Sequence, residues 1–294
     1  MESQSDPAPL VVIVGQTASG KSSLAINLAQ RFNGEIVCAD SRTVYQGMDI
    51  GTAKPTPDDQ LKVQHHLIDI VQPDHLFTAN DFQKAAQTAI KVIHNRGKLA
   101  VVVGGTGLYI DSILYDFSFR RGSTSNRAQL ETLSVAQLQA LISSQNLALP
   151  KNDRNPRHLI RVIESGAVAH TRRELRPNTL VIGLEVDKDM LAERIAIRTD
   201  HMLKAGLENE VRHLREKYGW NCPALQTIGY QEFKDYLEGH ISLEQVRDDI
   251  MLHTRQYAKR QKTWFKRNPD IQWICKTEDA VDLVTTFLNK SYTP

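Results

Sequence analysis

Short apolar runs alternate with amphipathic stretches along the first third of the chain. The apolar runs are Leu10–Val14, Glu35–Ala39 and Leu99–Val103. Between them lie Ser22–Phe32 and Asp81–Asn95, in which apolar residues recur at helical spacing. Strands that alternate with helices in this way predict a parallel sheet with helices on both faces.

The alternation stops in the middle of the chain. A polar, turn-rich stretch begins near residue 119, and Leu130–Ile142 again has apolar residues at helical spacing. We therefore predict a short helical insertion, whose end is set at 176 but could lie as early as 151. The chain is thus divided into a core of residues 8–118 and 177–294 and an insertion of residues 119–176.

The strand pattern resumes after the insertion. Thr179–Val186 is a further apolar run, and the chain from Leu191 onward is almost wholly helical in pattern. Only Trp273–Cys275 suggests another short strand near the end. The expected class is α/β, with one parallel sheet and flanking helices.

A glycine-bounded loop joins the first apolar run to the first amphipathic stretch. Its sequence, Gly15-Gln16-Thr17-Ala18-Ser19-Gly20-Lys21-Ser22, has the spacing of a phosphate-binding loop in the required context of strand, loop and helix. Backbone N–H groups and the helix dipole would hold a diphosphate, Lys21 would reach a terminal phosphate, and the Ser22 hydroxyl would hold Mg²⁺. This predicts a P-loop NTPase-like fold with diphosphate bound by Gly15, Thr17, Ala18, Ser19, Gly20, Lys21 and Ser22.

Composition narrows the class of protein. The 294 residues are 41% hydrophobic and carry a net charge of only +2, so a nucleic-acid partner cannot be inferred from total charge. The three cysteines are scattered, which fits a reducing compartment and argues against a zinc site. The amino-terminal residues lack the pattern of a signal peptide, and no apolar run approaches roughly 18 residues. We expect a cytoplasmic enzyme or binding protein without a membrane partner, and infer no obligate protein partner.

An acid follows the second apolar run directly. Asp40 would lie at the carboxyl end of a strand, the edge where parallel sheets bind ligands. Three interpretations remain open from the residue alone. Asp40 could bind Mg²⁺, could cap the turn that begins at Ser41, or could act as a base that orients and deprotonates an acceptor.

The third apolar run ends in glycines instead of an acid. Gly104-Gly105-Thr106-Gly107 would let the backbone pass close to a ligand and offers the hydroxyl of Thr106. A plain tight turn is the alternative. An ATPase would need an Asp or Glu at this place, so its absence counts against hydrolysis.

Basic side chains collect on the predicted helix near the carboxyl terminus. Lys259, Lys262 and Lys266 form one stripe, and no acid occurs between Asp249 and Asp270. The stripe could bind RNA phosphates or be an ordinary solvated face. Arg260, Trp264 and Arg267 form a row beside it, and a second, more mixed basic cluster borders the insertion at Lys151, Arg154, Arg157, Arg161, Arg172, Arg173 and Arg176.

Taken together, these motifs resemble the tRNA dimethylallyltransferase family. The resemblance is carried by the phosphate-binding loop, by the long block Asp40–Pro55, and by shorter matches further on. The shorter matches are His65–Asp69, Val103–Tyr109, Ile228–Tyr230 and Thr254–Trp264. The insertion is shorter than is usual in the family, and Gln16 stands where proline is common, a place at which we expect only the backbone to matter.

The resemblance implies a reaction and a set of site residues. The family transfers a dimethylallyl group from dimethylallyl diphosphate to N6 of adenosine 37, beside the tRNA anticodon, and uses Mg²⁺. It implies catalytic roles for Asp40 as base, Thr106 beside the leaving diphosphate oxygen, and Arg198 as a diphosphate clamp. For contact with the tRNA anticodon stem-loop it implies Asp40, Ser41, Arg42, Thr43, Thr106, Arg157, Arg161, Gly229, Tyr230, Lys259, Arg260, Lys262, Trp264 and Lys266.

Two other activities fit parts of the pattern. An adenylate isopentenyltransferase would use the same donor, but a small acceptor needs neither the basic helix nor an insertion. A small-molecule P-loop kinase could use Lys21, Asp40 and Arg198 for phosphoryl transfer. A nucleotide-dependent RNA-binding module without catalysis is the remaining alternative.

Overall fold

The computed structural model describes residues 7–115, 127–165 and 174–291. The chain divides into two compact units. The first consists of residues 1–116 and 175–294, and the second of residues 117–174. The expected start of the insertion, near residue 119, falls outside the described residues.

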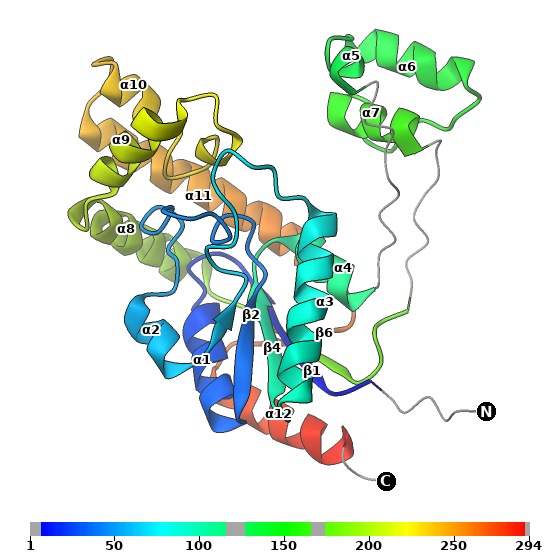
Figure 1. Ribbon diagram of the computed structural model, residues 1–294, viewed down its shortest axis with the longest axis vertical. Helices are drawn as coiled ribbons and strands as arrows, with labels where there is room; N and C mark the ends of the chain where they lie inside the picture. The colour runs from blue at the N-terminus through cyan, green and yellow to red at the C-terminus, as the bar shows by residue number, and fades with distance from the viewer. Residues whose placement is uncertain (1–6, 116–126, 166–173, 292–294) are drawn as a thin grey trace. The chain divides into compact units, whose positions relative to one another are not determined.

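A six-stranded parallel sheet forms the centre of the first unit (Figure 1). The strand order is β3-β2-β4-β1-β5-β6, so β1 lies inside the sheet between β4 and β5. All six residues of β1 and of β4 are buried, as expected for strands covered on both faces. The strands are β1 Leu10–Gly15, β2 Gly34–Cys38, β3 His65–His66, β4 Leu99–Gly104, β5 Thr179–Leu184 and β6 Ile271–Ile274.

Helices join the strands and cover the sheet. A 3₁₀ turn, η2, spans Pro223–Leu225. The helices of the first unit are α1 Lys21–Arg31, α2 Pro57–Lys62, α3 Ala79–Asn95, α4 Gly107–Leu114, α8 Lys188–Lys204, α9 Leu207–Tyr218, α10 Phe233–Leu237, α11 Leu243–Phe265 and α12 Glu278–Ser291.

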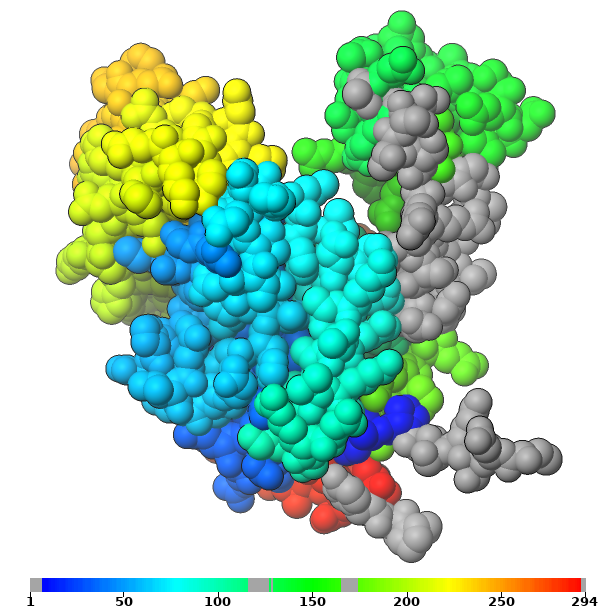
Figure 2. All heavy atoms as spheres, in the orientation of Figure 1, coloured from blue at the N-terminus to red at the C-terminus, as the bar shows by residue number. Residues whose placement is uncertain are grey.

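The two faces of the sheet carry different helices. Val11 and Ile13 belong to an apolar cluster with Leu28 of α1 and Val284 of α12. Successive strand residues point to opposite faces, so Val12 points to the other side, where α3 packs on β2 and β4. Side chains of the cyan segment that includes α3 cover this face and largely hide β1 (Figure 2). The predicted parallel sheet with helices on both faces is confirmed.

The second unit is a small helical bundle with its own core. It contains α5 Arg127–Glu131, α6 Val135–Ser144 and α7 Pro156–Ser165. Leu138, Ile142 and neighbouring apolar side chains of α5 and α7 form one buried cluster. The single helix expected over Leu130–Ile142 is instead two, because Ser134 caps α6 in a capping box with Gln137 and begins a new helix there.

The other predicted elements agree with the structure, with one omission. The runs at Leu10, Glu35, Leu99 and Thr179 form β1, β2, β4 and β5, and the run near Trp273 forms β6. Strand β3 is only two residues long and has no alternating pattern, which explains why the sequence does not reveal it.

A buried carboxylate fastens this short edge strand. Glu35 of β2 is 2% exposed, and its oxygens contact His66 Nε2 at 2.7 Å, Lys98 Nζ at 2.9 Å and Arg96 Nη1 at 3.2 Å. Burial raises the pKa of Glu35, but hydrogen bonds from His66, Lys98 and Arg96 outweigh it and lower the pKa to about 2. Glu35 therefore ties β3 and the start of β4 to β2.

No helix in the described part of the chain is both long and apolar enough to cross a lipid bilayer.

We predict that the free energy of unfolding falls in acid because Glu35 becomes protonated. Its folded pKa of about 2 lies below the ordinary value of 4.5, so the carboxylate stabilises the fold above pH 4.5 and loses this effect as the pH falls toward 2. The contribution is on the order of 3 kcal/mol. Glu35→Gln should lower the free energy of unfolding at pH 7, measured by urea titration, and should flatten its decline between pH 4.5 and 2. The exposed Glu216→Gln is the control, and equal effects of the two changes would contradict the prediction.

Candidate active site

The loop between β1 and α1 has the backbone expected of a phosphate cradle. Ala18 has a φ of 61° and Gly20 a φ of 95°, both in the left-handed region, and α1 begins at Lys21. Gly15 lies so close to β5 that an added Cβ would meet Leu184 O at 3.0 Å. Lys21 Nζ donates to the Gln16 carbonyl, which holds the ammonium over the loop.

Two side-chain amides, one from the loop and one from helix α11, join this loop to α11. Gln16 Nε2 donates to Ala258 O at 3.1 Å. Gln261 Oε1 accepts from the Thr17 N–H at 2.7 Å, and its Nε2 donates to Gly105 O at 3.0 Å. The expectation that Gln16 contributes only its backbone is therefore wrong, because its amide is one of the anchors of the loop.

Arginines from α8 reach the same loop. Arg198 Nη1 donates to Thr17 Oγ1 at 2.9 Å, and Arg194 Nη1 donates to Ser19 O at 3.3 Å. Arg198 Nε and Ser19 Oγ are buried, and neither has a hydrogen-bond partner among the described residues. Buried polar groups are normally paired. These two therefore mark a place suited to an anionic ligand.

The glycine turn after β4 faces the loop and permits very close backbone contacts. A Cβ on Gly104 would lie 2.0 Å from Ala39 O, and one on Gly107 would lie 2.4 Å from Trp264. No side chain of any kind fits at Gly104 in this backbone, so an acid of the ATPase kind has no room there. Thr106 Oγ1 accepts from the Ser41 N–H at 3.1 Å, so the turn also positions the residues after β2.

Asp40 lies between two cavities that share part of their walls. The first, about 270 Å³, is lined by the phosphate-binding loop together with apolar residues such as Ile36 and Val103. The second, about 360 Å³, is lined by Arg42, by the Gln226–Gly229 segment and by α11. Both cavities are lined by Thr17, Asp40, Thr52, Arg198 and Tyr257.

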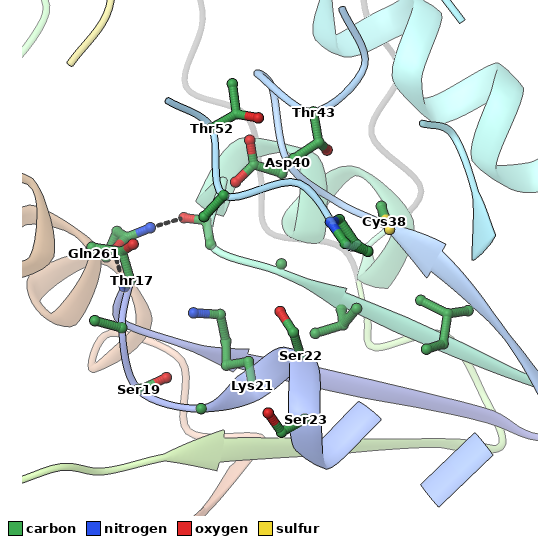
Figure 3. Close-up of a pocket in the computed structure, with 18 of the residues that line it drawn as sticks. Thr17, Ser19, Lys21, Ser22, Ser23, Cys38, Asp40, Thr43, Thr52 and Gln261 are labelled. Carbon is green, nitrogen blue, oxygen red and sulfur yellow. Dashed lines mark hydrogen bonds between the residues drawn. The ribbon is translucent and has the colours of Figure 1, made fainter. Parts of the chain in front are cut away.

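Side chains of the first cavity converge from opposite walls. Lys21 and Ser22 point from the start of α1 toward Asp40 and Thr52, which lie on the facing wall (Figure 3). Thr43 Oγ1, on the same wall, is buried without a partner in the described part of the chain. Asp40 Oδ1 accepts from the Arg42 N–H at 2.8 Å, so Asp40 caps the following turn while it lines both cavities.

The cavity changes the ionisation of its side chains. Burial lowers the pKa of Lys21 to about 7, while Asp40 raises it and Arg198 lowers it further. Burial, with a smaller effect from Asp40, raises the pKa of the Cys38 thiol to about 12. Cys38 therefore stays a thiol at neutral pH and is a poor nucleophile, although it lines the first cavity.

Tyr257 and Gln261 are site residues that the sequence did not reveal. They stand four residues apart on α11, on the side that lines the first cavity. Burial and the charge of Asp40 raise the pKa of Tyr257, and the side chains of Thr106 and Gln261 act in the opposite direction. The sequence holds two weak signals for them: both lie in the matching block Thr254–Trp264, and they share a helical spacing that ordinary core residues also have.

The basic residues of α11 have unequal surroundings. Lys262 Nζ and Lys266 Nζ lie 3.0 and 3.4 Å from the same Glu185 oxygen. The stripe free of acids in the sequence thus meets in space an acid that follows β5 directly. Lys259 is exposed, and Arg260 stacks on Tyr257 and lines the second cavity.

Trp264 is 39% exposed and packs against Gly107. Its Nε1 donates to Asp111 Oδ2 at 2.9 Å, so the indole links α11 to α4.

The residues of the Ile228–Tyr230 match lie partly at the second cavity and partly in the interior of the protein. Gly229 lines the second cavity, with a φ of 94° and its N–H bound to Glu232. Tyr230 is fully buried, and its hydroxyl donates to Glu210 Oε1 at 2.6 Å. Glu210 also accepts the N–H groups of residues 49–51, so Tyr230 and Glu210 shape the turn of the long matching block.

The second unit carries the remaining candidates for RNA contact. Arg157 and Arg161 are exposed on α7, as are Lys151 and Arg154 before it. Arg172 and Arg173 lie outside the described residues.

Comparison with known proteins agrees over nearly the whole chain. A family model described as IPP transferase matches residues 43–268. A tRNA dimethylallyltransferase of Staphylococcus epidermidis is 40% identical over 305 residues, covering 96% of this chain and 92% of that protein. One of Bacillus subtilis is 39% identical over 286 residues, covering 92% and 91%.

Solved structures have the same fold. The full-length tRNA isopentenylpyrophosphate transferase of Bacillus halodurans has a TM-score of 0.76 at 36% identity, covering 97% of this chain and 98% of that chain. A eukaryotic dimethylallyltransferase described as acting on tRNA has a TM-score of 0.83 at 26% identity, covering 97% and 80%. With this identity over this length, the chain belongs to the IPP transferase family.

Proposed function

We propose that this protein transfers a dimethylallyl group from dimethylallyl diphosphate to N6 of adenosine 37 in tRNA and releases diphosphate. The observation that carries the proposal is the pair of cavities that meet at Asp40. One cavity has a phosphate-binding loop and the other has polar and basic walls, so two substrates can approach one carboxylate from different sides.

The first cavity suits the diphosphate donor. Loop N–H groups, Lys21 and Arg198 would bind the diphosphate, and Thr106 would meet the oxygen that leaves carbon C1. Ile36, Cys38 and Val103 provide apolar surface for the five-carbon chain. The donor binds with its charged end and its hydrocarbon end in matching surroundings.

The second cavity suits the acceptor base. The adenine would be extruded from the anticodon loop, which costs less from a loop than from a duplex. Its N6 attacks C1 as the bond between C1 and the diphosphate oxygen breaks, and Asp40 accepts the proton that N6 loses. Holding amine, carbon and leaving group in line supplies much of the acceleration. The reaction needs no covalent enzyme intermediate.

The oxygen-bearing side chains near the phosphate-binding loop also fit Mg²⁺. This ion prefers oxygen ligands and is usually bound by few protein groups together with substrate phosphates. Ser22 supplies a hydroxyl in the first cavity, opposite the Asp40 carboxylate. When bound, Mg²⁺ would neutralise charge on the diphosphate, with Ser22 as its protein ligand.

In each unit taken by itself, we propose basic residues that contact RNA. Lys259 and Arg260 on α11, Arg42 at the second cavity, and Arg157 and Arg161 on α7 would contact phosphates. Tyr230 would act from the interior by shaping the turn after Asp40. A tRNA acceptor and three free cysteines support a cytoplasmic location.

One assay separates the proposed activity from the other activities. The protein is incubated with Mg²⁺, labelled dimethylallyl diphosphate, and either an anticodon stem-loop with adenosine at position 37 or AMP. Label in the RNA at N6 supports the proposal. Label in AMP alone would indicate an adenylate isopentenyltransferase, and phosphate transfer from ATP would indicate a kinase.

We predict that Asp40→Asn slows prenyl transfer by about 10²- to 10⁴-fold, because the amide cannot accept a proton. Affinity for inorganic pyrophosphate with Mg²⁺, measured by calorimetry, should change little. The amide can still accept from the Arg42 N–H, so the turn is kept. Loss of Mg²⁺ affinity together with activity would instead identify Asp40 as a metal ligand.

We predict that pyrophosphate affinity falls as the pH rises above about 7, the pKa of Lys21 in the free protein. The ammonium binds the anion, so each pH unit above that value should weaken binding by up to about tenfold. Lys21→Arg keeps its charge throughout this range. Ionisation of pyrophosphate affects both proteins equally, so the ratio of their dissociation constants isolates Lys21. A ratio that is constant from pH 6.5 to 8.5 would contradict the prediction.

We predict that Lys259→Ala weakens binding of the stem-loop and reduces the slope of log affinity against log salt by about one. Lys262→Ala is the matched comparison on the same helix, and its effect should be smaller because Lys262 already neutralises Glu185. Fluorescence anisotropy over a salt series measures both. An unchanged slope for Lys259→Ala would mean that Lys259 belongs to an ordinary solvated face.

A further inference from the structure

Gln261 uses both ends of its amide to join two separate loops. The side chain is buried, with the residue 5% exposed, and it extends from α11. Its Oε1 accepts from the Thr17 N–H at 2.7 Å, and its Nε2 donates to Gly105 O at 3.0 Å. Thr17 belongs to the phosphate-binding loop, and Gly105 belongs to the turn after β4.

Each of these loops contacts residues that we assign to one of the two substrates. On one side, Thr17 Oγ1 accepts from Arg198, the expected diphosphate clamp. On the other, Thr106 follows Gly105 and accepts from the N–H of Ser41, the residue after Asp40. Hydrogen bonds and two short pieces of backbone therefore connect the donor half to the acceptor half through one amide group.

The packing leaves this amide little freedom. A Cβ on Gly105 would lie 2.2 Å from Gln261 Nε2, so the side chain lies directly against the turn. The second anchor, from Gln16 to Ala258, holds the same helix against the phosphate-binding loop. A buried amide with both ends paired is rigid, and leaving either partner unpaired is unfavourable.

We propose that Gln261 is a positioning residue that fixes the diphosphate loop relative to the Thr106 turn, and so aligns carbon C1 of the donor with the acceptor nitrogen. The inference rests on the proposed prenyl transfer. It also assigns the Thr17 N–H to Gln261, which leaves the following N–H groups of the loop for the diphosphate. Gln261 itself touches neither reacting atom in this scheme.

Gln261→Met tests the proposal, because methionine has similar length but cannot form either hydrogen bond. We expect the single-turnover rate at saturating donor and stem-loop to fall by about 30- to 100-fold, since a misplacement of about 1 Å can cost about 10²-fold. Stem-loop affinity should stay within threefold of wild type. Gln256→Met is the matched control, an exposed glutamine on the same helix, and should leave the rate unchanged.

A second variant separates the two ends of the amide. In Gln261→Glu one carboxylate oxygen can still accept from Thr17, but the other faces Gly105 O and has no proton to donate. We expect hydrogen exchange of the Thr17 amide, measured by NMR, to accelerate at least tenfold in Gln261→Met and to stay near the wild-type rate in Gln261→Glu. Prenyl transfer should be slow in both.

The outcomes are distinct from those that test the function itself. A folded Gln261→Met variant with a rate within threefold of the Gln256→Met control would overturn the positioning role. A Thr17 amide that exchanges in Gln261→Met at the wild-type rate would overturn it as well. If Gln261→Met does not fold, Gln261→Glu decides by the same rate comparison. A wild-type protein that makes no prenylated RNA would overturn the proposed function, while exchange at Thr17 would still test the contact.

Discussion

The close approach of three strand ends is the constraint on which the site depends. β1, β2 and β4 are neighbours in register, and their carboxyl ends bring the phosphate-binding loop, Asp40 and Thr106 to one edge. The approach is so tight that Gly104 has no room for a side chain against the Ala39 carbonyl. An acid of the ATPase kind cannot stand there, and the backbone with one threonine hydroxyl takes its place.

Helix α11 supplies site residues in addition to those that come from the sheet edge and from α8. Its inner side supplies Ala258 and Gln261 to the phosphate-binding loop and Tyr257 to both cavities. Lys259 of the same helix is exposed to solvent, and Arg260, also exposed, stacks on Tyr257 at the second cavity. One helix thus carries a wall of the proposed donor site and part of the proposed RNA surface, so both substrates would be positioned relative to the same element.

Electrostatics in the site is governed by desolvation. Burial lowers the pKa of Lys21 to about 7, so its ammonium loses protons near neutral pH, and burial raises the pKa of the Cys38 thiol to about 12. Desolvation in one cavity therefore makes the charge of Lys21 sensitive to pH and keeps Cys38 in its weakly nucleophilic thiol form. Glu35 shows the opposite balance, because hydrogen bonds from His66, Lys98 and Arg96 outweigh the effect of its burial on its pKa.

Local patterns in the sequence determined the strands other than β3, the phosphate-binding loop and Asp40 at a strand end, because these depend on residues close in the chain. The apolar pattern did not reveal the break between α5 and α6, which the cap at Ser134 causes. It did not reveal β3 either, because two residues are too few to form a pattern. Only the tertiary structure decided that Lys262 and Lys266 are already paired, since Glu185, the residue after β5, is far from them in the sequence. It also placed Tyr230 in the interior and Gln261 between two loops, because burial and amide contacts arise from packing between segments far apart in sequence.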